Sequence, residues 1–299
     1  MFIETPLEST CPVHGTPGVV LGYSGNTDVY QCPECELCYL GKSVRPQSFL
    51  DNQWYEGFSQ HVEWGERFLA QLAPAYYRQL NVLESLTAGR HLADVGCGVG
   101  VFLAAAKESH WDVFGIEESP YAAGFAKQAY GLDYVPHLHS VKPSSLDVVR
   151  LSHVLEHIPE PVAFLQEVKR LLKPNGILSI IVPNREPLCC KLTNATRRVF
   201  SNKIKLAGAI YPNMHVLGFS VSSLTSLVTS QGFKKESAFT ISMGNPTYFP
   251  LFYDGLLNLK DPRTIPLKEL AKHWLPMLVN NLGNRLGWGE WIVGYFRKL

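Results

Sequence analysis

The sequence lacks any long apolar run, and no segment of its 299 residues approaches twenty consecutive apolar side chains. A helix that crosses a bilayer needs about twenty such residues, so we expect no membrane span. The N-terminus also lacks the basic stretch followed by an apolar stretch that marks a secretory signal. We therefore expect a cytoplasmic protein. Internal repeats and low-complexity tracts are absent from the sequence as well.

The chain also lacks a large excess of either charge. It contains 27 Lys and Arg against 26 Asp and Glu, which gives a formal net charge of +1. Proteins that bind nucleic acid through its phosphates need a basic surface, so this balance argues against a nucleic-acid partner. The one basic cluster is Arg197-Arg198 with Lys203 and Lys205, for which we favour a solvated helix face.

Cysteine is present in an odd number, seven. Without a secretory signal, this favours thiols or metal ligands over a disulfide framework. Two short pairs stand near the N-terminus, residues 11–14 (CPVH) and 32–35 (CPEC), and such paired knuckles bind one tetrahedral zinc ion. Four protein ligands leave no open coordination position, so the expected zinc is structural. The expected zinc ligands are Cys11, His14, Cys32 and Cys35.

The segment between the two pairs, residues 22–28, is typical of a hairpin tip between short strands, as in a zinc ribbon. Two alternatives stay open. The N-terminus could be disordered with unrelated cysteines, or Cys38 could substitute for one of the ligands. For Cys38 we favour packing against Leu37, Tyr39 and Leu40 in a small core.

The most informative stretch that is present is a glycine-rich turn between an apolar strand and an apolar helix, residues 91–103 (HLADVGCGVGVFL). Glycine has no Cβ, so it adopts positive φ angles and leaves room for a ligand against the backbone. The pattern is G-x-G-x-G, and Val101 stands where the dinucleotide fingerprint needs its third glycine. Asp94 would repel a pyrophosphate but can accept hydrogen bonds from loop amides or from a cationic amine. The turn therefore indicates a nucleotide-like ligand other than a dinucleotide.

Residues 94–100 (DVGCGVG) resemble the first motif of class I S-adenosylmethionine-dependent methyltransferases. A second strand, residues 111–116, is followed by Glu117, which matches the acid that holds the two ribose hydroxyls in this family. Residues 145–161 are similar to the family's fourth strand and the loop after it. The resemblance implies S-adenosylmethionine as the cofactor. The cofactor-binding residues that it implies are Asp94, Gly96, Cys97, Gly98, Gly100, Glu117, Glu118, Ser152 and His153.

The resemblance covers roughly residues 88–184 and points to the branch that methylates small metabolites, sugars and quinone precursors. A helix that begins near residue 164 is expected to stop at Pro174 and Gly176, before a fifth strand over residues 177–183. One departure concerns the third strand, residues 132–136, after which the family often places an acid for the adenine amine. This chain has His137-Leu138-His139-Ser140 there, so a backbone carbonyl or a histidine could take that role.

These patterns predict an α/β fold, with a Rossmann-like seven-stranded methyltransferase sheet, helices on both faces and a small N-terminal zinc ribbon. We expect the ribbon in residues 1–45, similar to the ribbon that some sugar methyltransferases carry. Residues 46–88 are expected to form a helical lead-in or cap, with a helix from about Glu63 to Leu86. Residues 89–243 are then the cofactor-binding core, and residues 244–299 add insertion helices and the last strand of the core sheet.

The C-terminal half contains further predicted core elements and an insertion. The patterns predict a capped helix over residues 220–230, strands over residues 233–241 and 288–296, and a helix near residues 267–282. The insertion at residues 244–286 is rich in Pro, Leu and aromatic residues. A lid over the substrate, a dimer surface and a membrane-surface element are all compatible with it. Its apolar bias favours a partner surface, such as that of a homodimer.

Methyl transfer from a sulfonium leaves a neutral thioether, so alignment of the nucleophile supplies much of the rate enhancement. A general base is needed when the acceptor is a hydroxyl or an acidic carbon. Histidine suits this role because it titrates near neutral pH, and His215 and His153 rank together, above His157. A structural role is the alternative for each of the three. Glu156 either orients His157 or lies at the surface.

The favoured function is methylation of a small-molecule acceptor, either a sugar nucleotide or a natural-product intermediate. One alternative is an RNA methyltransferase whose ribbon contacts nucleic acid. Against it, no Lys or Arg occurs between Cys11 and Leu40. The other alternative is a cofactor-binding subunit without catalytic activity.

Overall fold

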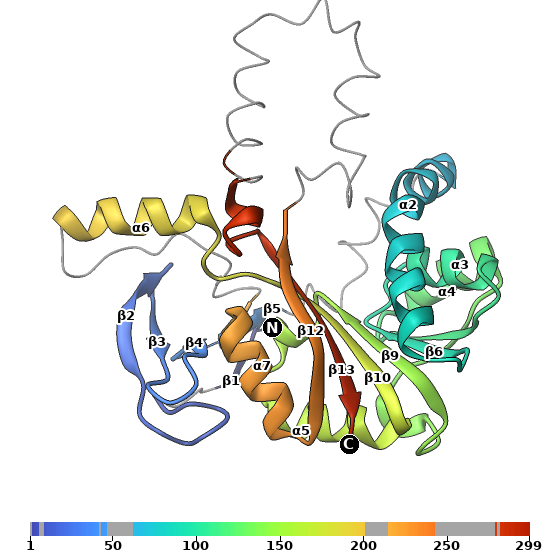
Figure 1. The fold of residues 1–299 in the computed structure, drawn as a ribbon, viewed down its shortest axis with the longest axis horizontal. Coiled ribbons are helices and arrows are strands. Elements are labelled where there is room, and N and C mark those ends of the chain that lie inside the picture. The colour runs from blue at the N-terminus through green and yellow to red at the C-terminus, as the bar shows by residue number, and fades with distance from the viewer. Residues whose placement is uncertain are drawn as a thin grey trace, which may run out of the picture.

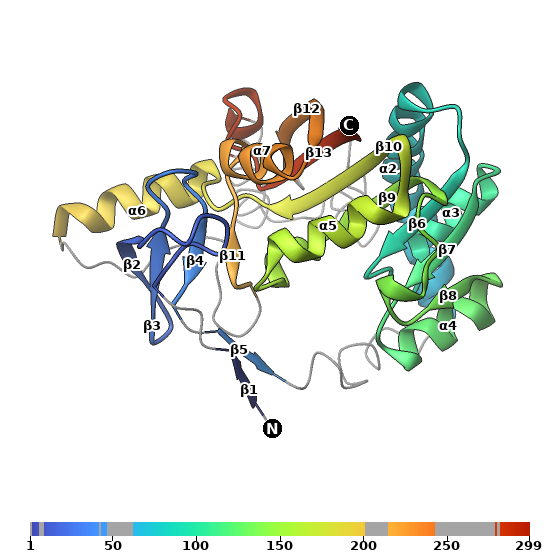
Figure 2. The same ribbon diagram turned by 90° about the horizontal axis from the view of Figure 1, so that it is seen from below.

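The computed structural model describes residues 2–5, 9–41, 43–46, 62–200, 215–242, 279 and 282–299. The seven strands of its central sheet are β6 (His91–Val95), β7 (Asp112–Ile116), β8 (Asp133–Val135), β9 (Leu146–Ser152), β10 (Leu172–Pro183), β12 (Phe233–Ile241) and β13 (Trp291–Lys298). They lie in the order β12-β13-β10-β9-β6-β7-β8; the strands from β12 to β6 can be followed in Figure 1, and β7 and β8 are labelled in Figure 2. The strands from β8 to β10 are parallel, whereas β13 is antiparallel to both β10 and β12.

Helices cover both faces of this sheet. The helices that the structure describes include α2 (Val62–Leu86), α3 (Val101–Glu108), α4 (Pro120–Tyr130), α5 (Pro161–Leu171), α6 (Leu188–Phe200) and α7 (Val221–Ser230), with the 3-10 helices η2 (Leu138–Ser140) and η3 (Leu155–His157). Leu92 packs in the core on the side of α2 and α3, whereas the next residue, Ala93, packs in the core on the side of α5 and α7. Such alternation is expected of a strand that is buried on both faces. The prediction of a Rossmann-like seven-stranded sheet with helices on both faces is confirmed.

Local sequence signals placed several elements closely. Strand β12 has the predicted bounds. Helix α7 begins after a capping box, in which the Ser220 and Ser223 hydroxyls each accept a hydrogen bond from the other residue's N–H. Helix α5 ends at Leu171 rather than at Pro174, because proline lacks an N–H and disfavours a helical conformation in the residue before it.

The N-terminal segment forms a small antiparallel sheet. Its strands are β2 (Val19–Ser24), β3 (Thr27–Gln31), β4 (Cys38–Leu40) and β11 (Leu217–Gly218). The order is β11-β4-β3-β2, so a strand from the later part of the chain completes it (Figure 2). The predicted hairpin is present, with its turn at Gly25 and Asn26. Strands β1 (Phe2–Thr5) and β5 (Ser43–Pro46) form a separate antiparallel pair.

Several predicted features lie outside the described residues. They are the start of the lead-in at residues 47–61, Lys203 and Lys205, and most of the insertion at residues 244–286 with its helix. The domain boundaries and the homodimer therefore stay predictions. Helix α2 matches the lead-in helix expected from about Glu63 to Leu86. Among the helices that the structure describes, none is both long and apolar enough to cross a membrane.

Candidate functional site

The glycine-rich turn joins β6 to α3, and all three of its glycines have left-handed backbone conformations. The φ angle is 65° at Gly96, 52° at Gly98 and 79° at Gly100. The Gly96 N–H donates to the Ile116 carbonyl over 2.7 Å, which ties the turn to the end of β7. A Cβ on Gly96 would lie 2.7 Å from Val154 Cγ2, in the loop after β9. A side chain at residue 96 would therefore be both strained and crowded.

The Glu117 carboxylate lies against this turn. The Gly98 N–H donates to its Oε2 and the Ser119 N–H to its Oε1, each over 2.9 Å. Burial raises the pKa of Glu117, and these two N–H donors oppose that effect. A carboxylate oxygen has two lone pairs, so each oxygen can accept a further hydrogen bond from a hydroxyl. Glu118, by contrast, is exposed.

Asp94 is buried at the end of β6, and its partner is an arginine. Asp94 and Arg150 are register partners on adjacent strands, and Arg150 Nη1 donates to both carboxylate oxygens over 2.9 Å. The guanidinium carbon also lies 3.9 Å from the centre of the Phe102 ring. Burial raises the pKa of Asp94, although the charge and hydrogen bonds of Arg150 oppose this.

The role of Arg150 was not predicted from the sequence. The signal that could have revealed it is a single arginine in the middle of the largely apolar strand β9, which the structure buries. Burying a lone guanidinium is costly, so a buried acid on a neighbouring strand is the partner to seek. That acid is Asp94, which the sequence had paired with loop amides or a ligand amine.

The remaining parts of the turn fit an adenosine-containing cofactor. Cys97 is half-buried over β7, and burial raises the pKa of its thiol. A Cβ on Gly115 would collide with the Cys97 sulfur, so β7 also needs a glycine where it passes beneath the turn. A carboxylate at Glu117, glycine backbone without Cβ atoms and the absence of any basic residue within 94–100 suit ribose hydroxyls better than a pyrophosphate.

The expected adenine side of the site follows β8. No acid stands there, and the rings of His137 and His139 stack with their centroids 5.1 Å apart. The residue that contacts adenine therefore stays a prediction.

The end of β9 and the loop after it carry the predicted catalytic residues. Ser152 is the last residue of β9. His153 follows in a left-handed conformation, with a φ of 56°, and its ring packs edge-on against Trp291 at 5.1 Å. His157, in η3, lies with its ring centroid 4.9 Å from that of His215. The three predicted histidines thus come together from two distant segments.

Glu156 lies among these histidines and is only 1% exposed. Its Oε1 is 3.4 Å from His153 Nδ1 and 4.0 Å from His157 Nε2. The Val216 N–H donates to the Glu156 carbonyl over 2.8 Å, so the segment that carries His215 covers this loop. The surface position that the sequence allowed for Glu156 is wrong, because this later segment packs over it.

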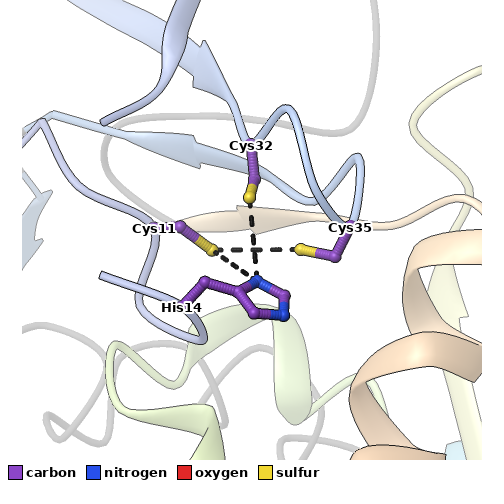
Figure 3. Close-up of side chains that lie close together, drawn as sticks. All are labelled: Cys11, His14, Cys32 and Cys35. Carbon is purple, nitrogen blue, oxygen red and sulfur yellow. Dashed lines mark hydrogen bonds between the residues drawn. The ribbon is translucent and has the colours of Figure 1, made fainter. Parts of the chain in front are cut away.

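Near the N-terminus, the four predicted zinc ligands point toward one another (Figure 3). Cys11 Sγ lies 3.8 Å from His14 Nδ1 and 3.9 Å from Cys35 Sγ, and Cys32 Sγ lies 3.7 Å from His14 Nδ1. Zinc bonds of about 2.3 Å to sulfur and 2.0 Å to nitrogen separate tetrahedral ligands by about 3.5–3.8 Å. The four side chains therefore fit a zinc ion in number, type and spacing.

Each ligand pair lies in a backbone turn of its own, and the two turns have the same geometry. The Gly15 N–H donates to the Cys11 carbonyl over 2.8 Å, and the Glu36 N–H donates to the Cys32 carbonyl over 3.0 Å. The donor residue is left-handed in each case, with φ angles of 70° at Gly15 and 60° at Glu36. One repeated backbone geometry thus aims two side chains from each turn at a common point.

Cys38 lies outside this ligand cluster. It is buried with Val29 and Leu40, as expected of a packing residue. Arg185 Nη1 also donates to its sulfur over 2.6 Å, which joins the N-terminal sheet to the segment after β10.

Comparison with known proteins places this geometry in a family. The model of a family described as a methyltransferase domain matches residues 64–238, which is more than half of the chain. The chain belongs to this family. The match includes the turn at 94–100, Glu117 and the histidines next to β9 and β11. The candidate site therefore lies inside the matched methyltransferase domain.

Curated relatives of this methyltransferase-domain protein include enzymes named ubiquinone biosynthesis O-methyltransferase. The one from Acinetobacter baumannii is 30% identical over 148 residues, which cover 46% of this chain and 60% of that relative. The one from Methylococcus capsulatus is 33% identical over 107 residues, which cover 33% of this chain and 45% of that relative. The chain thus spans about half of the length of these relatives.

Solved structures share the fold. A protein from Thermotoga maritima, described as a possible histamine N-methyltransferase, aligns with a TM-score of 0.50 at 17% identity, over 84% of this chain and all of that one. Phosphoethanolamine N-methyltransferase 2 from Haemonchus contortus, in complex with S-adenosylmethionine, aligns with a TM-score of 0.52 at 14% identity. That alignment covers 92% of this chain and 70% of that one. The class I methyltransferase fold is therefore shown.

Proposed function

We propose that this protein transfers a methyl group from S-adenosylmethionine to a hydroxyl of a small molecule, a sugar nucleotide or a natural-product intermediate. The observation that carries the proposal is the glycine turn at 94–100 with the Glu117 carboxylate bonded to the Gly98 N–H. This arrangement combines close backbone approach with acceptors for ribose hydroxyls. Family membership and the fold support the same cofactor.

In this proposal Gly96, Gly98 and Gly100 admit the cofactor against the backbone, while Cys97 packs beneath it. Glu117 accepts hydrogen bonds from the ribose hydroxyls, with Glu118 at the rim of the ribose site. Ser152 and His153, at the end of β9, contact the methionine end. Asp94 acts through its ion pair with Arg150, which holds the ends of β6 and β9 in register beneath the turn.

S-adenosylmethionine, when bound, supplies an electrophilic methyl group on a sulfonium. The chain must place the acceptor oxygen in line with that methyl carbon and remove the hydroxyl proton. A histidine from the group His153, His157 and His215 would act as the base, since all three lie around the Glu156 carboxylate. A hydroxyl acceptor agrees with the O-methyltransferase names of the curated relatives.

The acceptor class is tested by a product screen. Purified protein is incubated with methyl-labelled S-adenosylmethionine and, in separate reactions, with sugar nucleotides, phenols and bulk RNA. We expect label in a sugar nucleotide or a phenol. Incorporation into RNA alone would replace this proposal with an RNA methyltransferase, and binding of the cofactor without any transfer would favour a non-catalytic subunit.

The base is tested by His153→Asn, His157→Asn and His215→Asn, with cofactor affinity and turnover measured separately. Asparagine suits position 153 because it tolerates a left-handed backbone better than most residues do. A base contributes roughly 10²–10⁴-fold to the rate, so the variant that lacks it should lose turnover on that scale at saturating cofactor. Cofactor affinity should stay unchanged in His157→Asn and His215→Asn, whereas His153→Asn also removes a proposed contact to the methionine end and should weaken it. Normal turnover in all three variants would rule out histidine as the base.

We also propose that Cys11, His14, Cys32 and Cys35 bind one structural zinc ion. Four protein ligands leave no open coordination position on the ion for a substrate, and such a site is typical of a structural zinc. Its function would be to hold the β2–β3–β4 sheet together, since this sheet is too small to fold on apolar burial alone.

A further inference from the structure

Glu156, His157 and His215 form a second set of groups with metal-ligating chemistry. One ligand atom from each lies within 4.8 Å of the other two. The set is built by the fold rather than by one flexible loop. Glu156 and His157 belong to η3, and the hydrogen bond from the Val216 N–H to the Glu156 carbonyl fixes the segment carrying His215 against them.

The environment of the buried Glu156 carboxylate favours binding of a cation. It is 1% exposed, and among the described residues neither of its oxygens has a hydrogen-bond partner. Burying a carboxylate without hydrogen bonds costs several kcal/mol, so buried carboxylates are normally paired or bound to metal. Two imidazoles border the same oxygen, at 3.4 Å for His153 and 4.0 Å for His157.

We propose that Glu156, His157 and His215 bind a divalent transition-metal ion, Zn²⁺ or Mn²⁺, at the methyl-transfer end of β9. Two imidazoles and one carboxylate are ligands that such ions accept, and three protein ligands leave positions open for a substrate. Bonds of about 2.1 Å allow two ligands of one ion to lie up to about 4.2 Å apart, so shifts below about 1 Å would close the set. The site differs from the N-terminal cluster, where four ligands fill a tetrahedron.

The catalytic role of this ion rests on the proposed function. The open coordination positions of the ion favour an acceptor with two neighbouring oxygens. The substrate class is therefore a vicinal diol or a catechol. A bound hydroxyl loses its proton more readily because the metal ion stabilises the oxyanion. His153, which is not needed as a ligand, then remains as the base beside the carboxylate and Trp291.

The transfer step balances in atoms and charge. The acceptor hydroxyl gives its proton to His153, and the oxygen forms a bond to the methyl carbon. The bond between that carbon and the sulfonium sulfur breaks, and its electron pair stays on the sulfur. The products are a methyl ether, S-adenosylhomocysteine and a protonated His153.

The site is tested by titrating the full-length protein with Mn²⁺ alone and counting bound ions by electron paramagnetic resonance. Mn²⁺ is a suitable probe because thiolate sites select zinc rather than manganese, so the N-terminal cluster does not report. We expect one Mn²⁺ per wild-type chain and at least tenfold weaker binding in Glu156→Gln and in His215→Asn. Glu160→Gln, which removes an exposed carboxylate a few residues further on, should bind as the wild type does.

Folding of each variant is checked by circular dichroism and by its affinity for S-adenosylmethionine, which Glu156→Gln should leave unchanged. A wild-type chain that binds no Mn²⁺, or a folded Glu156→Gln that binds it with wild-type affinity, would overturn the metal site. The titration needs no acceptor, so Mn²⁺ binding together with a failed product screen would retain the site and reject the proposed function. Turnover that persists after removal of divalent ions would overturn the catalytic role of the metal.

Discussion

The ion pair between Asp94 and Arg150 supports the glycine-rich turn at residues 94–100. Both side chains are almost fully buried, at 3% and 6% exposure, and they join β6 to β9 directly beneath the glycines. A buried pair adds little net stability compared with apolar residues of the same size, because both charges must be desolvated. Removal of one partner is different, since the remaining charge is then buried without compensation.

We predict that Arg150→Met lowers the free energy of unfolding by about 3–5 kcal/mol, because it leaves the Asp94 carboxylate unpaired in the core. Denaturant unfolding followed by fluorescence measures this. The double variant Asp94→Asn/Arg150→Met removes both charges and should regain a large part of the loss. A single variant that unfolds at the wild-type midpoint would show that the pair does not carry the register of the two strands.

At the scale of elements, Asp147 fastens the start of β9 to its neighbours. Its Oδ2 accepts from the His91 N–H over 3.1 Å, and its Oδ1 accepts from Lys173 Nζ over 2.9 Å. Burial acts to raise the pKa of Asp147, but the hydrogen bonds from Lys173 and His91 outweigh it, so the pKa is lowered. The charged carboxylate therefore stabilises the folded state.

We predict that Asp147→Asn costs about 1 kcal/mol of unfolding free energy at pH 7, the usual net contribution of one intramolecular hydrogen bond, because the amide of the variant can keep one of the two bonds. A lowered folded pKa means that this contribution is complete above the unfolded pKa of about 3.9 and is lost as the pH falls through the folded value. Unfolding of both proteins at pH 7 and pH 3 measures the difference, which should shrink at pH 3. Asp112→Asn, at an exposed pair with His91, is the control and should change stability by less than about 0.5 kcal/mol.

Element positions followed from the sequence where the signal was local. The glycine at position 232, which separates α7 from the strand Phe233–Ile241, and the serine cap before α7 act within a few residues, and both elements were placed correctly. The partner of Asp94 was not predicted, because strands β6 and β9 are separated in sequence by two strands, two α-helices and a 3-10 helix. Likewise, nothing local to Glu156 shows that the Val216 segment covers it.

At the scale of the whole molecule, the N-terminal sheet is attached to the candidate site. Strand β4 pairs with β11, and the Leu40 N–H donates to the Val216 carbonyl over 3.1 Å. The Val216 N–H in turn donates to the Glu156 carbonyl, and His215 is the adjacent residue. The N-terminal cluster thus supports, through two backbone hydrogen bonds, a segment that carries a candidate catalytic group.

We predict that removing zinc from the N-terminal cluster unfolds residues 9–41 and loosens residues 215–219. Affinity for S-adenosylmethionine should stay within about threefold, since the turn at 94–100 is built from β6, β7 and β9 and not from the ribbon. A thiol-reactive mercurial with a chelator releases the zinc, hydrogen exchange reports on the two segments, and calorimetry reports on the cofactor. Unchanged exchange in residues 9–41 after complete zinc release would contradict a structural role for the metal.

Calorimetric titration with S-adenosylmethionine and with NAD tests whether the turn at Asp94–Gly100 is an S-adenosylmethionine site. We expect the wild type to bind one equivalent of S-adenosylmethionine and no NAD. Gly96→Ala should weaken binding at least about tenfold, because the free variant relaxes out of the left-handed turn, and restoring that turn for the cofactor costs roughly 1–2 kcal/mol before the contact with Val154 is counted. Gly124→Ala, in an exposed turn of α4 where a Cβ meets nothing within 4 Å, should bind as the wild type does. Binding of NAD, or S-adenosylmethionine affinity that is the same in Gly96→Ala as in the wild type, would contradict the account.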